Sequence, residues 1–427
     1  MMHSKTVLDN GVRILSEKLT HFHSISLGLW VNVGSREETS KDNGISHFLE
    51  HMIFKGTRTR TTLEIAKQLD AIGSLSNAFT GKEYTCFHSR VLDRHFPILG
   101  EILSDIFLNS IFDPKEMERE RQVILQEISM VEDTPDEQIH ELFNKQFWTG
   151  HPLGRSILGT VETVSSIKKE HILAYMERFY APERIIIACA GNVDHEELTA
   201  YFRPLFESIG SSVKRVRPSS PLIKAGVSCN FKKLEQVHIC MGGRAPKISS
   251  DLRFASTILN TMLGGNMSSR LFQEIREKRG LAYSIYSFLS AYSDSGLLGV
   301  YVGTSPSDAN RVLGLINGEV RKLQNGEISA SDLEEVKENL IGGILLGAES
   351  TDSKMMRLAK NEFVFGKYIG YDELIARLEK VTLDEVVEAA GETFQDNGVS
   401  LSTLGPLRQE DLDLSCLQFN GRGNPRP

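Results

Sequence analysis

Two histidines and one glutamate stand close together near residue 50, at a spacing that suits metal binding. They occupy the segment His47-Phe48-Leu49-Glu50-His51. Residues four apart lie on one face of a helix, so both imidazoles can reach the same ion. Glu50 lies between the two histidines on the same side, where its carboxylate can exchange a proton with a group near the ion. The segment therefore predicts a metal site with an acid–base residue beside it.

The surrounding residues predict an amphipathic helix that begins near Gly44. Apolar side chains recur at the spacing of one helical face, namely Ile45, Phe48, Leu49, Met52 and Ile53. One face would pack into a core, while the other presents the ligands in the His-x-x-Glu-His order of an inverted zinc-peptidase motif. Taken alone, the pattern also fits a solvated polar face that contains two histidines.

A second predicted helix, opened by Asp113 and Pro114, carries two carboxylates on a stripe that is otherwise apolar. The stripe consists of Met117, Glu120, Ile124, Glu127 and Val131. Burying a carboxylate is unfavourable unless it is paired or bound to a metal. The spacing fits equally a partly exposed helix whose glutamates reach solvent. However, a zinc site with two histidines lacks a third protein ligand, and a carboxylate from a second helix would supply it.

Composition is typical of a globular protein with more than one domain. The chain has 427 residues, of which 40% are hydrophobic and 24% charged, and it is too long for one ordinary core. A net charge of −8 without any basic run argues against a nucleic-acid partner. No stretch approaches the ~18 apolar residues of a membrane helix. We expect a bacterial-type cytoplasmic protein without signal or transit peptide, whose scattered cysteines are reduced.

Strands and helices are predicted to alternate along the first half of the chain. The expected strands cover 5–16 (a hairpin around Asp9-Asn10-Gly11), 24–33, 73–80, 83–91 and 184–191. The expected helices cover 61–72, 93–108, 161–179 and 194–208. The polar stretch at 211–226, rich in Pro, Ser and Gly, predicts a linker.

After this linker the same plan begins again, about 210 residues later. The segment 237–243 resembles the strand at 25–31, a helix is expected over 251–263, and 296–323 echoes the strand and helix at 83–108. Asn260 and Thr261 then fall at the positions of Glu50 and His51. We therefore predict a zinc-bearing catalytic domain (1–210), a homologous domain without zinc ligands (227–407) and a flexible tail (408–427).

Together these motifs resemble the pitrilysin/insulinase family of zinc peptidases. The nearer match is its half-length branch, which includes bacterial processing-type peptidases and the mitochondrial processing peptidase β-subunit. The resemblance covers roughly residues 5 to 405, and no zinc-site position departs from it. It implies that one zinc ion per chain is held by His47, His51 and Glu127, and that Glu120 lies beside the site rather than on the metal.

The resemblance also identifies residues outside the zinc motif. Asn77, Ala78, Phe79 and Thr80 match an edge strand that pairs with substrate backbone. Arg276 and Tyr283 match an element of the second domain that reaches the scissile region. Without the resemblance, these two would be read as surface charge and as an aromatic residue at the start of a strand.

The implied fold is α+β, with two similar domains that form half of a clam-shell chamber. Each domain would have a mainly antiparallel sheet with helices packed on one side. Longer members of the family carry four such domains, so closing a chamber here requires a second chain. Because this chain carries both the zinc motif and the Arg/Tyr element, we expect a homodimer.

The implied activity is a zinc endopeptidase that cleaves unfolded peptides. Zinc would lower the pKa of a bound water, and Glu50 would act as its general base. Glu120 would orient a ligand histidine, and Arg276 and Tyr283 would stabilise the oxyanion. Two alternatives stay open: a non-catalytic structural or assembly subunit of the same fold, and the active half of a heterodimeric processing peptidase.

Overall fold

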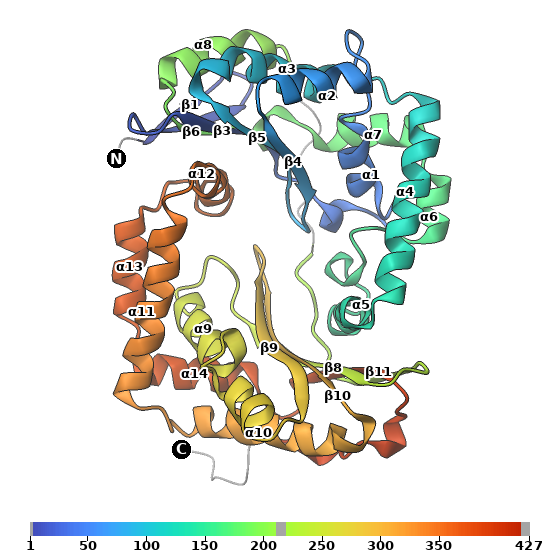
Figure 1. The fold of residues 1–427 in the computed structure, drawn as a ribbon, viewed down its shortest axis with the longest axis vertical. Coiled ribbons are helices and arrows are strands. Elements are labelled where there is room, and N and C mark those ends of the chain that lie inside the picture. The colour runs from blue at the N-terminus through green and yellow to red at the C-terminus, as the bar shows by residue number, and fades with distance from the viewer. Residues whose placement is uncertain (1–2, 211–218, 420–427) are drawn as a thin grey trace. The chain divides into compact units, whose positions relative to one another are not determined.

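The computed structural model describes residues 3–210 and 219–419, which form two compact units (Figure 1). Unit 1 comprises Met1–Met130, Arg155–Ser219 and Leu346–Ile369, and unit 2 comprises Val131–Gly154, Ser220–Leu345 and Gly370–Pro427. Each unit therefore draws on both halves of the sequence. Residues 211–218 of the predicted linker and 420–427 of the predicted tail lie outside the described residues, and the predicted domain boundaries stay a prediction.

Unit 1 is built on a six-stranded sheet in the order β1-β2-β6-β3-β5-β4. The strands are β1 (His3–Val7), β2 (Arg13–Lys18), β3 (Ser24–Val31), β4 (Leu75–Thr80), β5 (Thr85–Leu92) and β6 (Ile185–Gly191). Neighbouring strands are antiparallel except β2 and β6, which are parallel. β4 lies at one edge, so its outer side pairs with no other strand of the part of the chain that is described.

Helices cover one face of this sheet and enclose the larger core of unit 1. They are α1 (Ile45–Met52), α2 (Thr62–Ala71), α3 (Phe96–Asn109), α4 (Pro114–Asp133, which ends in unit 2), α6 (Val161–Ser166), α7 (Lys169–Phe179) and α8 (His195–Phe206). The apolar stripe of α1 is buried as expected, since Phe48, Leu49 and Met52 are 0% exposed. This burial fixes which face of α1 carries the histidines.

Unit 2 has a five-stranded sheet in the order β7-β11-β8-β10-β9. The strands are β7 (Val227–Phe231), β8 (Val237–Ala245), β9 (Ala282–Ala291), β10 (Gly296–Thr304) and β11 (Ser400–Gly405). The helices are α5 (Pro135–Phe147), α9 (Arg253–Asn260), α10 (Ala309–Gln324), α11 (Ala330–Gly347, which ends in unit 1), α13 (Tyr371–Glu379) and α14 (Leu383–Thr393). Two π-helical segments, Thr261–Gly265 and Phe272–Glu277, follow α9.

The second sheet repeats the topology of the first. When β1 is left out, the order of the first sheet is β2-β6-β3-β5-β4, and each of these strands has its counterpart in β7-β11-β8-β10-β9 of the second sheet. The parallel pair stands at the same place in both sheets, as β2 with β6 in the first and β7 with β11 in the second. β8 corresponds to β3, and β10 to β5, as the spacing of about 210 residues predicts. The structure thus confirms an α+β fold with two similar domains, in which both sheets are mixed and mainly antiparallel.

The two halves of the sequence exchange one helix each. α12 (Thr351–Phe365), from the second half, packs on the second face of the unit 1 sheet against β2, β3 and β6 (Figure 1). α5, from the first half, packs likewise on β8 and β11 of unit 2. A buried ion pair fastens α12, since Nζ of Lys354 lies 2.6 Å from Oε1 of Glu17 on β2. Each sheet therefore has one helix on the face opposite its main helical layer.

Two predicted helices differ in detail from the observed ones. The helix expected over 161–179 is broken between α6 and α7, where Ile167 and Lys168 are extended. Arg121 of α4 caps the end of α6, because its guanidinium donates to the carbonyls of Val164 and Ile167. The helix expected over 251–263 changes from α to π after Asn260. Among the described residues, no helix has the length and apolarity needed to cross a membrane.

Candidate active site

The helix that carries the histidines begins at a backbone turn that glycine permits. Gly44 has φ = 94°, and a Cβ there would lie 2.7 Å from the carbonyl oxygen of Leu158. Glycine is therefore required at this position. The turn sets the direction in which α1 leaves the preceding loop.

The buried carboxylate of Glu38 caps α1 from outside the helix. Its two oxygens accept hydrogen bonds from the backbone N–H groups of Gly44 (2.8 Å) and Ser46 (2.9 Å). A third hydrogen bond comes from the side chain of Asn43 (2.8 Å). Burial raises the pKa of Glu38 to about 7 against the opposing effect of these hydrogen bonds, and in its ionised form the carboxylate satisfies otherwise unpaired donors and complements the helix dipole. These contacts hold the first turn of α1, which bears His47.

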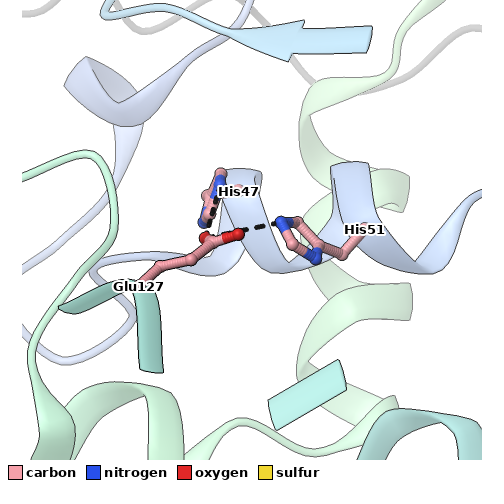
Figure 2. A group of neighbouring side chains, drawn as sticks. All are labelled: His47, His51 and Glu127. Atoms are coloured by element: carbon pink, nitrogen blue, oxygen red, sulfur yellow. Dashed lines mark ion pairs between the residues drawn. The ribbon is translucent and has the colours of Figure 1, made fainter. Parts of the chain in front are cut away.

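His47, His51 and Glu127 converge as shown in Figure 2. Oε2 of Glu127, on α4, lies 3.7 Å from Nε2 of each histidine. In the described ranges, this is the only group of three His, Cys, Asp or Glu side chains whose ligand atoms lie within 4.8 Å of one another. The sequence separates Glu127 from the histidines, and the packing of α4 beside α1 brings them together.

The spacing of these atoms suits a tetrahedral zinc ion. With bonds of about 2.0–2.1 Å, two ligands of such an ion are roughly 3.3–3.5 Å apart, close to the 3.7 Å from Glu127 to each histidine, and all three ligand atoms lie within 4.8 Å of one another. Two imidazoles and one carboxylate form a common ligand set of catalytic zinc, which leaves one position for water or substrate. The donor set therefore fits the metal that the motif predicts.

The environment of His47 keeps its imidazole neutral, which is the form that binds metals. Burial, together with the neighbouring His51, lowers the pKa of His47 to about 4. Its Nδ1 is buried and has no hydrogen-bond partner among the described residues. Of the two ring nitrogens, Nε2 is the one that lies near Glu127.

The Nδ1 atom of His51 contacts a carboxylate that is itself paired with a lysine. Its Nδ1 lies 3.1 Å from Oε2 of Glu120, a distance at which the ring N–H donates to the carboxylate. The other oxygen of Glu120 lies 2.7 Å from Nζ of Lys55. A hydrogen bond at Nδ1 fixes the tautomer and leaves Nε2 free to bind a metal. The structure thus brings Glu120 to His51, and Glu120 lies beside the ligand group rather than within it.

Glu50 extends from α1 toward the end of β4. Its Oε2 accepts a hydrogen bond of 2.6 Å from the hydroxyl of Thr80. Burial raises the pKa of the Glu50 carboxyl, and Glu127 acts in the same direction, while hydrogen bonding from Thr80 and the proximity of His51 oppose the rise. An elevated pKa brings a carboxylate closer to the range in which it can accept and return a proton at neutral pH.

The four residues expected to bind substrate backbone, Asn77, Ala78, Phe79 and Thr80, all lie on β4. This strand has an unpaired edge among the described residues. An unpaired edge can accept a further strand through backbone hydrogen bonds. The location agrees with the predicted role, which stays a prediction.

Arg276 and Tyr283 lie together in unit 2. The guanidinium of Arg276 lies over the rings of Phe272 (4.7 Å) and Tyr283 (4.9 Å). Tyr283 is 80% exposed. Arg276 lies in the π-helical segment Phe272–Glu277 and Tyr283 at the start of β9, while the ligand histidines belong to unit 1. The role of Arg276 and Tyr283 toward the metal site stays a prediction.

Three contributors to the site were not recognised from the sequence: Glu38, Lys55 and the side chain of Thr80. Glu38 lies six residues before Gly44, the N-cap of the helix that it caps, outside any capping-box spacing. Lys55 is four residues after His51, a spacing that could have indicated a shared helix face. Thr80 was assigned to substrate backbone, and no sequence pattern links its hydroxyl to Glu50.

Two protein-family models match this chain. The model described as insulinase (peptidase family M16) matches residues 13–161, and the model described as the peptidase M16 inactive domain matches residues 166–340. The second match begins at the end of α6 in unit 1 and extends through β7, β8, β9 and β10 of unit 2, where the repeat carries no ligand histidines.

The chain is also similar to bacterial proteins along most of their length. It is 39% identical to the zinc protease YmxG of Bacillus subtilis over 405 residues, which cover 95% of this chain and 98% of that protein. It is 38% identical to a zinc protease of Streptomyces coelicolor over 414 residues, which cover 95% of this chain and 90% of that protein. The similarity therefore extends over both units.

Solved structures share the fold at lower sequence identity. A protease from Helicobacter pylori superimposes with a TM-score of 0.87 at 22% identity, covering 94% of this chain and 99% of that one. A protein from Pseudomonas fluorescens described as a peptidase M16 inactive domain superimposes with a TM-score of 0.88 at 18% identity, covering 96% and 99%.

Proposed function

Because this chain belongs to the insulinase family of peptidases (peptidase family M16), we propose that it is a zinc endopeptidase that cleaves unfolded peptides. The observation that supports this proposal most directly is the convergence of His47, His51 and Glu127. Its relatives from Bacillus subtilis and Streptomyces coelicolor are named zinc proteases. One zinc ion per chain would be held by these three side chains.

When bound, zinc would polarise the scissile carbonyl and lower the pKa of a water molecule next to it. Glu50 then acts as the general base. Its carboxylate takes a proton from the attacking water and passes that proton to the nitrogen of the leaving amine. Burial of Glu50 favours this cycle because it raises the pKa of the carboxyl. Glu120 keeps the His51 ring in the orientation that directs Nε2 toward Glu127, where the two side chains would hold the zinc.

Substrate binding in this proposal uses the free edge of β4. An extended peptide would add to Asn77–Thr80 as a further strand, which requires a segment without its own secondary structure. Unfolded peptides should therefore be preferred over folded proteins. Arg276 and Tyr283 would hold the scissile carbonyl or the developing oxyanion. We also propose that two copies of the chain form a homodimer, which encloses the substrate in a chamber.

The test compares the wild type with Glu50→Gln on a mixed peptide library, read by product mass spectrometry with and without a chelator. We expect Glu50→Gln to reduce cleavage by at least about 100-fold while zinc content stays at one ion per chain. The exposed Glu118 on α4 offers a matched control, Glu118→Gln, which should leave cleavage unchanged. Undiminished cleavage by Glu50→Gln would exclude the role given to Glu50.

The alternative of a non-catalytic subunit predicts a different result, namely no cleavage by the wild type and no zinc in the freshly purified protein. The heterodimer alternative is distinguished by the solution mass. A homodimer has twice the 47.7 kDa of one chain and is active alone. The active half of a heterodimer would be inactive until its partner was added.

A further inference from the structure

Thr80 is the last residue of strand β4. Successive side chains of a strand point to opposite faces of the sheet. Ala78 packs against the core that contains α1, whereas Phe79 contacts Trp30 on the opposite face. Thr80 shares the face of Ala78. Its side chain therefore points toward α1 and not toward the unpaired edge of the strand.

On that face the hydroxyl of Thr80 meets the carboxylate of Glu50. The distance from its Oγ1 to Oε2 of Glu50 is 2.6 Å, and the next acceptor, the carbonyl oxygen of Ser46, is 3.5 Å away. A hydroxyl has one proton to donate, and the shorter contact, to a carboxylate, takes it. No other side chain within the described ranges hydrogen-bonds to Glu50.

This contact distinguishes the two carboxylate oxygens of Glu50. Oε2 accepts the hydroxyl proton of Thr80, and the backbone of Thr80 also contributes a weaker hydrogen bond to the carboxyl, while no side chain of the described residues engages Oε1. Proton transfer depends steeply on the position of the accepting atom, so a carboxylate held in one rotamer is a better base than a mobile one. A donor that stays protonated throughout the reaction suits this task.

We propose that Thr80 is a positioning residue for the general base: its hydroxyl holds Oε2 of Glu50 and leaves Oε1 to accept the proton of the attacking water. This inference rests on the proposed function. In the step concerned, an O–H bond of water breaks, an O–H bond forms at Oε1, and the proton later moves to the nitrogen of the leaving amine. Thr80 keeps its own proton.

The proposal gives Thr80 two separable parts. Its side chain holds Oε2 of Glu50, while its backbone, which also contributes to hydrogen bonding of the Glu50 carboxyl, belongs to the strand on which substrate would pair. A substitution that changes only the side chain should therefore act on kcat and leave KM unchanged, since strand pairing uses backbone groups. A residue that served substrate binding alone would show the reverse.

The experiment compares Thr80→Val, which removes the hydroxyl at nearly constant shape, with Thr80→Ser, which retains it. We expect kcat of Thr80→Val to fall about 10- to 100-fold because Glu50 is no longer held, with KM and zinc content unchanged. Thr80→Ser should restore most of the activity. Thr85→Val is the matched control, because Thr85 pairs with Thr80 across the hairpin and donates to the carbonyl of Val33, not to Glu50.

Three results would overturn the proposal. They are an unchanged or increased kcat in Thr80→Val, a rise in KM at constant kcat, and a loss of kcat that Thr80→Ser does not restore. Cleavage by the wild type and its loss in Glu50→Gln are measured in the same assay. If the wild type itself does not cleave peptides, the proposed function fails, and that outcome is distinct from failure of the role of Thr80.

A second readout does not require activity. Thermal unfolding of the metal-free protein is measured for Thr80→Val, Glu50→Ala and the double variant. A direct contact predicts that Thr80→Val lowers the midpoint in the wild-type background but not once Glu50 is replaced by alanine. Equal shifts in both backgrounds would show that the hydroxyl does not act through Glu50.

Discussion

Replacing Glu120 should weaken zinc binding although Glu120 is not a ligand. In the structure Glu120 connects two groups, since its oxygens lie 3.1 Å from Nδ1 of His51 and 2.7 Å from Nζ of Lys55. Its side chain is 10% exposed, so water cannot readily take its place. Without this carboxylate, His51 can rotate or protonate at Nε2, and both changes oppose metal binding.

The magnitude depends on what replaces the carboxylate. Loss of such a supporting hydrogen bond typically weakens metal affinity 10- to 100-fold, or about 1.4–2.8 kcal/mol. Glu120→Gln keeps an oxygen that can accept from His51, and Lys55 is exposed enough to reach solvent, so we expect about a 10-fold loss. Glu120→Ala removes the acceptor and should approach a 100-fold loss.

The assay is a competition titration of metal-free protein against a chromogenic zinc chelator at neutral pH. Glu118→Gln is the matched control, because Glu118 lies on the same helix with a 63% exposed side chain and, within the described part of the chain, pairs with Arg121 and Gln122 alone. A Kd for zinc in both Glu120 variants within about 2-fold of the wild type would refute the reasoning.

Three further predictions concern stability. Lys354→Met should lower the free energy of unfolding by about 3–5 kcal/mol in urea titrations, because it leaves the carboxylate of Glu17 buried without its partner. Glu38→Ala should cost about 1–3 kcal/mol and increase hydrogen exchange in the first turn of α1, because the N–H groups of Gly44 and Ser46 lose their acceptor. In the metal-free protein, the free energy of unfolding should fall as pH drops from about 6.5 toward 4, by about 3 kcal/mol in the limit. The reason is that histidine in the unfolded chain becomes protonated over this range, whereas burial keeps His47 neutral in the folded protein.

Each of these predictions has a result that contradicts it. Lys354→Met with wild-type stability would mean that the ion pair does not hold α12. Unchanged exchange in Glu38→Ala would mean that α1 is held by its apolar face alone. For the pH effect the sign is set by a folded-state pKa below the unfolded value, so the contribution is fully present above pH 6.5. A His47→Gln variant with the same pH dependence as the wild type would exclude His47 as its source.

Local elements were predictable where the pattern of apolar residues sets the burial. The hairpin around Asp9-Asn10-Gly11, the buried strand β6 and the face of α1 all follow from short-range periodicity. The capped start of α4 follows from Asp113, whose Oδ1 accepts hydrogen bonds from the N–H groups of Lys115 and Glu116. The repeat also follows, because the same order of elements recurs at a constant offset.

Long-range packing was not predictable in the same way. The exchange of α5 and α12 between the sheets depends on which apolar face each helix meets, and periodicity does not contain that information. The break between α6 and α7 depends on Arg121 of another helix. In each case the partner is distant in sequence, so neither propensity nor spacing indicates it.

The same distinction between local pattern and long-range packing applies to the candidate site. By itself, the sequence determined that His47, Glu50 and His51 share one helix face, because four residues of helix allow no other arrangement. Tertiary structure alone decided that Glu127 lies 3.7 Å from both histidines, that Glu120 and Lys55 stand behind His51, and that Thr80 holds Glu50. The physical reason is that a helix fixes its own side chains relative to one another, whereas contacts between α1, α4 and β4 depend on how their buried faces pack.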